Sequence, residues 1–293
     1  MSDITGAPSS STMLRWTSLI VIAANMAFIA VYNTLSETPT IAELAAGYGD
    51  VFVPAVFARG IGAVMLIAFL TFYVAALWPS NRRRRTYDKL VVPLVLTSVM
   101  ASGWIVAFRH EKIALSVAML VAIVALAGVM FTRVAAASPG KYSHWLRVPF
   151  SLHFAAMSVA LMVALTQWLN VGGAGAGTAA APDVVAIALL GIAAATGGFV
   201  AFRYNDFVYP AVIASATGAM FVAQHLIRPD VAFNALTVCV GMLVVAGLAL
   251  VALARQPRSE PRVRSSRSGA RFARRAPDEG WYPMEGTVSV IRF

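Results

Sequence analysis

Long apolar runs separated by short polar connections constrain this chain more than any other feature. In the clearest example, residues 102–130, two apolar runs meet at Arg109-His110-Glu111-Lys112. A helix needs roughly 20 apolar residues to cross a bilayer, and each run reaches that length once the residues before Ser102 are included. The connection is long enough only for a tight turn between antiparallel neighbours. The pattern therefore predicts a helical hairpin that crosses a membrane twice.

The same reading along the whole chain predicts an all-α integral membrane protein with eight transmembrane helices. Hydrophobic residues make up 59% of the sequence and charged residues only 12%, whereas about a quarter of a soluble domain is charged. The predicted spans are 14–34, 51–77, 90–108, 113–131, 148–169, 184–202, 207–226 and 231–254. A Gly/Ala-rich linker at 170–183 separates a five-helix core, 14–169, from a three-helix extension, 184–254. A flexible N-terminus, 1–13, and a basic tail, 255–293, complete the chain.

Basic residues predict the orientation in the membrane, because Lys and Arg concentrate in cytoplasmic connections. With a cytoplasmic N-terminus, 19 of the 23 Lys and Arg residues face the cytoplasm, including those of the tail. Seven spans would instead place the basic tail outside. We therefore expect a multi-pass protein of the cell inner membrane, with the N- and C-termini both cytoplasmic.

Two arginine clusters predict contacts at the cytoplasmic face. The connection before the third span carries Arg82, Arg83, Arg84 and Arg85, and the tail carries Arg274 and Arg275 among others. Arginines beside a span attract anionic lipid head groups, so we expect lipid rather than nucleic acid as the partner.

The end of the tail has a different composition. Residues 280–293 contain Trp281, Tyr282 and an alternating TVSVIRF run that is typical of a strand. A tail that only binds lipid does not need these residues, so the segment is interpreted as a docking peptide. This supports an alternative function as a structural or assembly subunit of a larger membrane complex. A homo-oligomer is a further expected form of assembly.

The sequence offers little chemistry for catalysis. It contains no GxSxG, HExxH, CxxC or glycine-rich phosphate loop, so a non-enzymatic protein is expected. Arg59, about two turns into the second span, is the clearest ionisable residue inside a span. It is expected to extend its charge to the surface, to pair with an acidic residue of the preceding connection, or to hold an anionic ligand. Buried carboxylates are not expected, which argues against a proton-driven transporter.

Aromatic and histidine side chains are the candidates for ligand contacts. Trp104 and Phe108 are four residues apart and share a helix face, where they pack helices together or line a pocket for a flat apolar ligand. Phe150 and His153 lie near the start of the fifth span. A haem held by two histidines requires a facing pair. His110 and His225 share a membrane face and meet only if spans three and seven pack together, whereas His153 lies near the other face.

Short motifs in spans one to five resemble those of the TspO/MBR family, the tryptophan-rich sensory proteins. Phe52-Val53-Pro54-Ala55 is similar to the family's F-x-P-x start of the second helix. Trp104 and Phe108 followed by Arg109-His110 resemble its W-x-x-x-F and basic residue, and Leu115 then opens the next helix. Arg147-Val148-Pro149-Phe150-Ser151 looks like the P-Y/F start of the last core helix. The resemblance covers residues 14–169 and is closest to long bacterial relatives that carry three extra helices.

The resemblance implies a five-helix bundle that binds a porphyrin-like or sterol-like molecule near the first loop, as a sensor, carrier or regulator. The contacts it suggests in this chain are Arg59, Trp104, Phe108, Phe150 and His153. Two positions depart from the family pattern, since His153 stands where the family has tryptophan and Leu161 where it has asparagine. A histidine in such a pocket is able to coordinate the metal of a haem or another tetrapyrrole.

Overall fold

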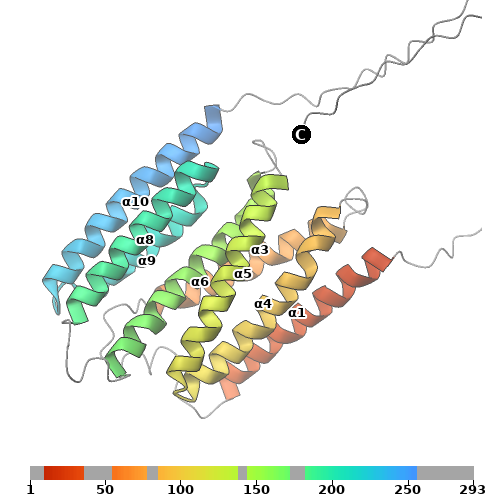
Figure 1. Cartoon of the computed structure of the whole chain (residues 1–293), viewed down its shortest axis with the longest axis horizontal. Helices are drawn as coiled ribbons and strands as arrows, with labels where there is room; N and C mark the ends of the chain where they lie inside the picture. The colour runs from red at the N-terminus through yellow and green to blue at the C-terminus, as the bar shows by residue number, and fades with distance from the viewer. Residues whose placement is uncertain (1–9, 36–54, 78–84, 138–143, 172–181, 256–293) are drawn as a thin grey trace, which may run out of the picture. The chain divides into compact units, whose positions relative to one another are not determined.

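The computed structural model describes residues 10–35, 55–77, 85–137, 144–171 and 182–255, which fold into eight α-helices (Figure 1). These are α1 (Ser10–Leu35), α3 (Ala55–Leu77), α4 (Arg85–Arg109), α5 (Ile113–Ala137), α6 (His144–Val171), α8 (Pro182–Tyr204), α9 (Val208–Gln224) and α10 (Pro229–Arg255). Each predicted span coincides with one helix. The differences lie at the helix ends: α4 begins at Arg85 rather than 90, α5 ends at Ala137 rather than 131, and α6 begins at His144 rather than 148.

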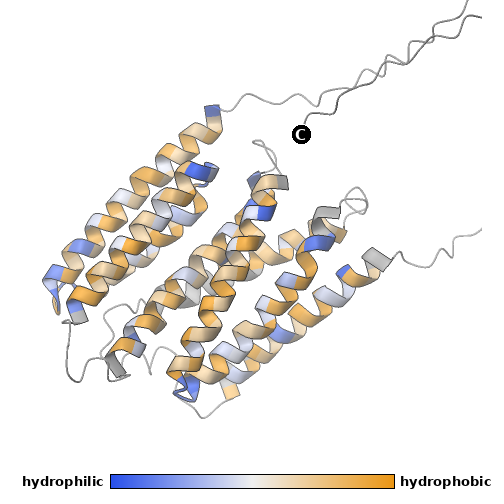
Figure 2. Cartoon of the chain, viewed as in Figure 1, coloured by the Kyte–Doolittle hydropathy of each residue, from blue (hydrophilic) through white to orange (hydrophobic). Residues whose placement is uncertain are grey.

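Five of these helices are long and apolar enough to cross a membrane, namely α4, α5, α6, α8 and α10. The described parts of α1, α3 and α9 give shorter apolar segments, Met13–Ile29, Ile67–Leu77 and Val208–Gln224. The prediction of an all-helical membrane protein is confirmed at this level, and the count of eight spans stays a prediction. In Figure 2 the helices are mostly orange along their lengths and blue mainly near their ends, as expected for helices surrounded by lipid.

In the first part of the chain, α4 packs between α1 and α5, and α5 packs against α6. Helix α6 is central, because it also contacts α3, α8 and α9, while α10 packs on α8 and α9. Residues from every helix contribute to one buried apolar cluster. The predicted core, 14–169, and extension, 184–254, therefore fold into one compact unit, which comprises residues 1–258.

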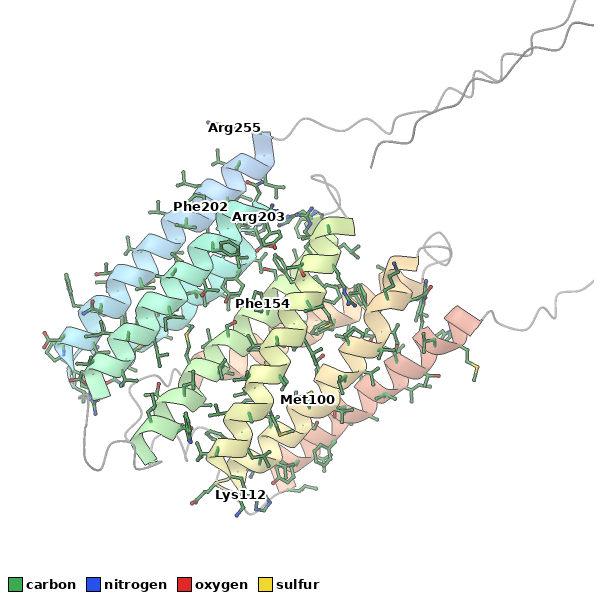
Figure 3. All side chains as sticks on the ribbon, viewed as in Figure 1. Met100, Lys112, Phe154, Phe202, Arg203 and Arg255 are labelled. Carbon is green, nitrogen blue, oxygen red and sulfur yellow. The ribbon has the colours of Figure 1, made fainter. Side chains whose placement is uncertain are left out.

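Tight turns connect two of the helix pairs. Between α4 and α5, the Lys112 backbone N–H donates to the carbonyl of Ala107 at 2.9 Å, and Glu111 adopts a left-handed conformation with φ 58°. Between α8 and α9, Asn205 has φ 50°, and asparagine tolerates this region better than most residues. Figure 3 labels Lys112 at one end of the helices and Arg203 and Arg255 at the other. We call these the hairpin end, which holds the α4–α5 turn, and the opposite end, which holds the α8–α9 turn.

Polar side chains join the first helices at both ends. At the opposite end, Arg15 of α1 donates to the Asp88 carboxylate at 2.8 Å and to the carbonyl of Ala76 in α3 at 2.7 Å. Further along α1, the amide of Asn25 donates to Ser98 of α4 at 2.9 Å. Apolar packing alone leaves the rotation of a lipid-facing helix about its axis undetermined. These hydrogen bonds determine that rotation for α1 relative to its neighbours.

Candidate functional site

An aromatic cluster surrounds His153 between α3 and α6. The ring centroids of Phe69 and His153 are 5.4 Å apart and those of Phe72 and Phe150 are 5.0 Å apart, both in edge-to-face geometry. Phe69 also lies 6.2 Å from Phe150. The structure thus brings together two of the predicted ligand residues, Phe150 and His153, and adds the two phenylalanines of α3. We call these four residues the His153 cluster.

The imidazole of His153 is buried without a polar partner. The residue is 6% exposed, and neither ring nitrogen has a hydrogen-bond partner among the residues that the structure describes. Burying a polar group without a partner costs roughly 1–3 kcal/mol in proteins. A native buried group of this kind therefore calls for an explanation, and a bound ligand is one.

Trp104 and Phe108 form a second pair, whose ring centroids are 6.3 Å apart. Trp104 packs on a smaller apolar cluster built from Val117, Leu120, Ile123 and Ala164, toward the hairpin end. The predicted ligand residues consequently divide between two places, with Phe150 and His153 in one and Trp104 in the other. Met157 packs both on this smaller cluster and on the main apolar cluster, which includes Phe69, Phe72 and Phe150.

The remaining predicted contacts lie outside the described residues. Arg59 belongs to α3, but its side chain is not among those described. The same holds for Arg85, the first residue of α4. Arg82, Arg83, Arg84, Arg274, Arg275, Trp281 and Tyr282 also lie outside the described segments.

Gln167 and Ser116 are two buried polar residues that the sequence reading did not select. Both are 0% exposed, and the Gln167 amide and the Ser116 hydroxyl have no partners among the described residues. Gln167 shares one face of α6 with His153, Ala160 and Ala164, at helical spacing. A single glutamine or serine in an apolar run gives little signal in sequence, because either side chain can equally face lipid or bond to its own helix.

A buried carboxylate at the opposite end corrects one sequence expectation. Asp206, in the α8–α9 turn, is 0% exposed, although no carboxylate was expected in the interior. Its Oδ1 accepts hydrogen bonds from the Ser151 hydroxyl at 2.7 Å and from the backbone N–H groups of Val208 and Tyr209 at 2.9 Å. Asp206 therefore caps the first turn of α9 and ties it to α6.

Two basic side chains of α6 accompany Asp206. His144 is 3% exposed and stacks on Phe207, with ring centroids 5.2 Å apart. Arg147 is 8% exposed and its Nη1 approaches the carbonyl oxygen of Tyr204 at 3.4 Å. The sequence placed both residues in a polar connection before the fifth span. Their burial beside Asp206 explains why α6 begins earlier than the apolar run.

The other histidines are engaged separately. The His110 Nε2 lies 3.5 Å from the Tyr32 hydroxyl, and the His225 Nδ1 lies 2.8 Å from the carbonyl oxygen of Val222. Each contact uses one ring nitrogen, and neither contact joins His110 to His225. Among the described residues, no group of three His, Cys, Asp or Glu side chains is arranged to hold a metal ion.

These features define a polytopic helical membrane protein whose interior combines aromatic rings with polar groups that lack partners among the described residues. The sequence comparison gives the family: the model of the TSPO-like protein family matches residues 15–251, and the chain belongs to this family. The predicted resemblance is thereby confirmed, and the match extends beyond residues 14–169 through nearly all of α10. No curated protein and no solved structure matches the chain.

Proposed function

We propose that this protein is a non-enzymatic, eight-span protein of the inner membrane that binds a flat hydrophobic ligand between its helices. Both termini face the cytoplasm in this proposal, because that orientation places 19 of the 23 Lys and Arg residues on the cytoplasmic side. The protein then acts as a sensor, carrier or regulator that responds to the ligand. The basic connection 82–85 and the tail contact anionic lipids at the same face.

The observation that carries the proposal is the buried His153 imidazole with no polar partner among the described residues. Aromatic edges and faces around it suit a flat ring system, since rings pack favourably at the 5–6 Å separations found here. A ligand that hydrogen-bonds or coordinates to His153 compensates for the free energy lost when the imidazole is buried.

Two ligand classes fit this site, a tetrapyrrole and a sterol-like molecule. His153 would hold the metal of a tetrapyrrole through one of its ring nitrogens. Among the described histidines, His144 lies nine residues earlier on the same helix, a rise of about 13 Å, and is too distant to serve the same metal. A sterol-like molecule would instead use the imidazole as a hydrogen-bond partner. Absorbance distinguishes the two, because only the tetrapyrrole is coloured.

Replacing His153 by alanine is expected to remove most of the bound ligand. The native protein, purified in mild detergent, should carry a chromophore or a lipid-like molecule in near-stoichiometric amount. In the His153→Ala protein we expect at least a tenfold loss, because a ligand bond in a buried site is worth about 1.5 kcal/mol or more. An absorbance spectrum and mass spectrometry of the extracted small molecules measure this.

His225→Ala is the matched control, since His225 is exposed and its ring bonds to its own helix. This variant should retain the ligand in full. A colourless native protein with no co-purifying molecule, and no saturable binding of added porphyrins or sterols, would contradict the proposal.

The second candidate function is that of a structural subunit in a larger membrane complex. The strand-like segment 281–293, which lies outside the described residues, favours it. Deleting this segment is expected to release the protein from its complex, seen as faster migration on a native gel. Migration at the size of the full complex after the deletion would count against this function. The deletion should leave ligand content unchanged, so the two functions are tested independently.

A further inference from the structure

Three side chains with buried polar atoms lie toward the hairpin end of the helices, one from each of α4, α5 and α6. They are Trp104, Ser116 and Gln167, which we call the polar triad. The Trp104 Nε1, the Ser116 hydroxyl and both amide atoms of Gln167 lack hydrogen-bond partners within the part of the chain that the structure describes. Ser116 and Gln167 are 0% exposed. The three groups are separate from the ion pairs and caps described above.

The packing of the helices places the triad at one level. Trp104 packs on the cluster that contains Val117, the neighbour of Ser116, and Ala164, which lies one turn before Gln167 on α6. Ser116 shares a helix face with Leu120, a member of the same cluster. All three polar groups therefore lie beside the same apolar cluster. Unpartnered polar groups gathered from three helices are unusual, because buried polar groups are normally paired.

The chemistry of the triad is neutral and mixed. The indole offers one donor, the hydroxyl offers a donor and acceptors, and the amide offers two donors and an acceptor. An alcohol matches this set, since its O–H donates to the Gln167 oxygen while its oxygen accepts from the indole or the amide. A carboxylate matches it less well, because a buried charge needs a charged partner. The nearby Arg109 donates to the carbonyl of Tyr32 at 2.8 Å and lies 4.7 Å from the centre of that ring.

We propose that the polar triad binds the hydroxyl group of an uncharged lipophilic alcohol whose apolar body packs on the adjoining cluster of Val117, Leu120, Ile123 and Ala164. This inference rests on the proposed function and narrows its ligand class. Ala164 belongs to this apolar cluster and Ala160 packs against it, so α6 presents small side chains beside the triad. The triad selects the polar group of the ligand, and the apolar cluster beside it holds the apolar body.

The test uses three fluorescent probes with the full-length protein in detergent: pyrene, 1-pyrenemethanol and 1-pyrenecarboxylate. Energy transfer from tryptophan to the pyrene ring reports binding, and an excess of unlabelled 1-naphthalenemethanol defines the saturable part. The wild-type protein is expected to bind 1-pyrenemethanol about tenfold more tightly than either of the other probes. Gln167→Met and Ser116→Ala should each reduce this preference at least fivefold, while Ser215→Ala leaves it unchanged. Ser215 is a matched control because its hydroxyl bonds to Val212 of its own helix at 2.9 Å.

A stability measurement separates ligand binding from a structural role. Methionine removes an unpartnered buried amide and keeps its volume, so Gln167→Met should raise the melting temperature of the ligand-free protein while weakening binding. A lower melting temperature with unchanged probe preference would overturn the assignment. Equal binding of pyrene and 1-pyrenemethanol would overturn the triad alone, because the ring would then bind without any contribution from the hydroxyl group. No saturable binding of any probe would overturn both the triad and the proposed function.

Discussion

Replacing Asp206 by alanine is expected to lower the free energy of unfolding by about 3 kcal/mol or more. The carboxylate is 0% exposed and accepts three hydrogen bonds, from the Ser151 hydroxyl and from two backbone N–H groups that begin α9. Alanine leaves all three donors without this acceptor, and removes the negative charge beside His144 and Arg147. The buried side chains of His144 and Arg147 would then lack the carboxylate that lies beside them in the wild-type protein. Thermal unfolding in detergent, or titration with a denaturing detergent, measures the loss.

Two further variants give this prediction its controls. Asp206→Asn keeps an acceptor oxygen but not the charge, so its loss should lie between those of the wild-type protein and Asp206→Ala. Asp230→Ala removes an exposed acid from the first turn of α10, where its interaction with the helix dipole is worth about 0.3–1 kcal/mol, so this variant should lose no more than that. A change of less than 1 kcal/mol in Asp206→Ala would show that apolar packing alone holds α9 against α6.

The helices could be predicted from the sequence because their signal is local. Each apolar run is bounded by charged or glycine-rich residues, and the hairpin at 109–112 appears where the sequence placed it. Spacing also predicted that Trp104 and Phe108 lie on one helix face, and their rings are indeed neighbours. Such features depend on residues a few positions apart, so a single sequence contains them.

The arrangement of the candidate site could not be predicted in the same way. In the sequence, Asp206 belongs to a short polar turn. It is buried because Ser151, His144 and Arg147 of α6 pack over that turn. The separation of Trp104 from the His153 cluster depends on the levels at which α3, α4 and α6 pack. Apolar runs do not specify these levels, because many helix registers bury similar apolar area. Buried polar groups such as Gln167 fix the register more sharply, yet the sequence does not show which of them are buried.

The second large effect is expected at Arg15, which joins three helices. Its side chain is 3% exposed and donates to Asp88 of α4 and to the carbonyl of Ala76 in α3. Arg15→Met keeps much of the apolar stem but removes the guanidinium. We expect a loss of about 3 kcal/mol, because a buried carbonyl and a partly buried carboxylate lose their donor. The same unfolding assay in detergent measures it.

The chain supplies a matched comparison in a second arginine–aspartate pair. Arg228 donates to Asp183 at 2.7 Å, almost the same distance as in the Arg15–Asp88 pair, but its side chain is 30% exposed and that of its partner 47%. An exposed pair is worth about 0–1 kcal/mol, so Arg228→Met should change stability by no more than that. Equal losses in the two variants would contradict the prediction. If Arg15→Met alone is strongly destabilising, burial rather than bond length determines the strength of the pair, and the ion pair at the opposite end keeps α1 beside α3 and α4.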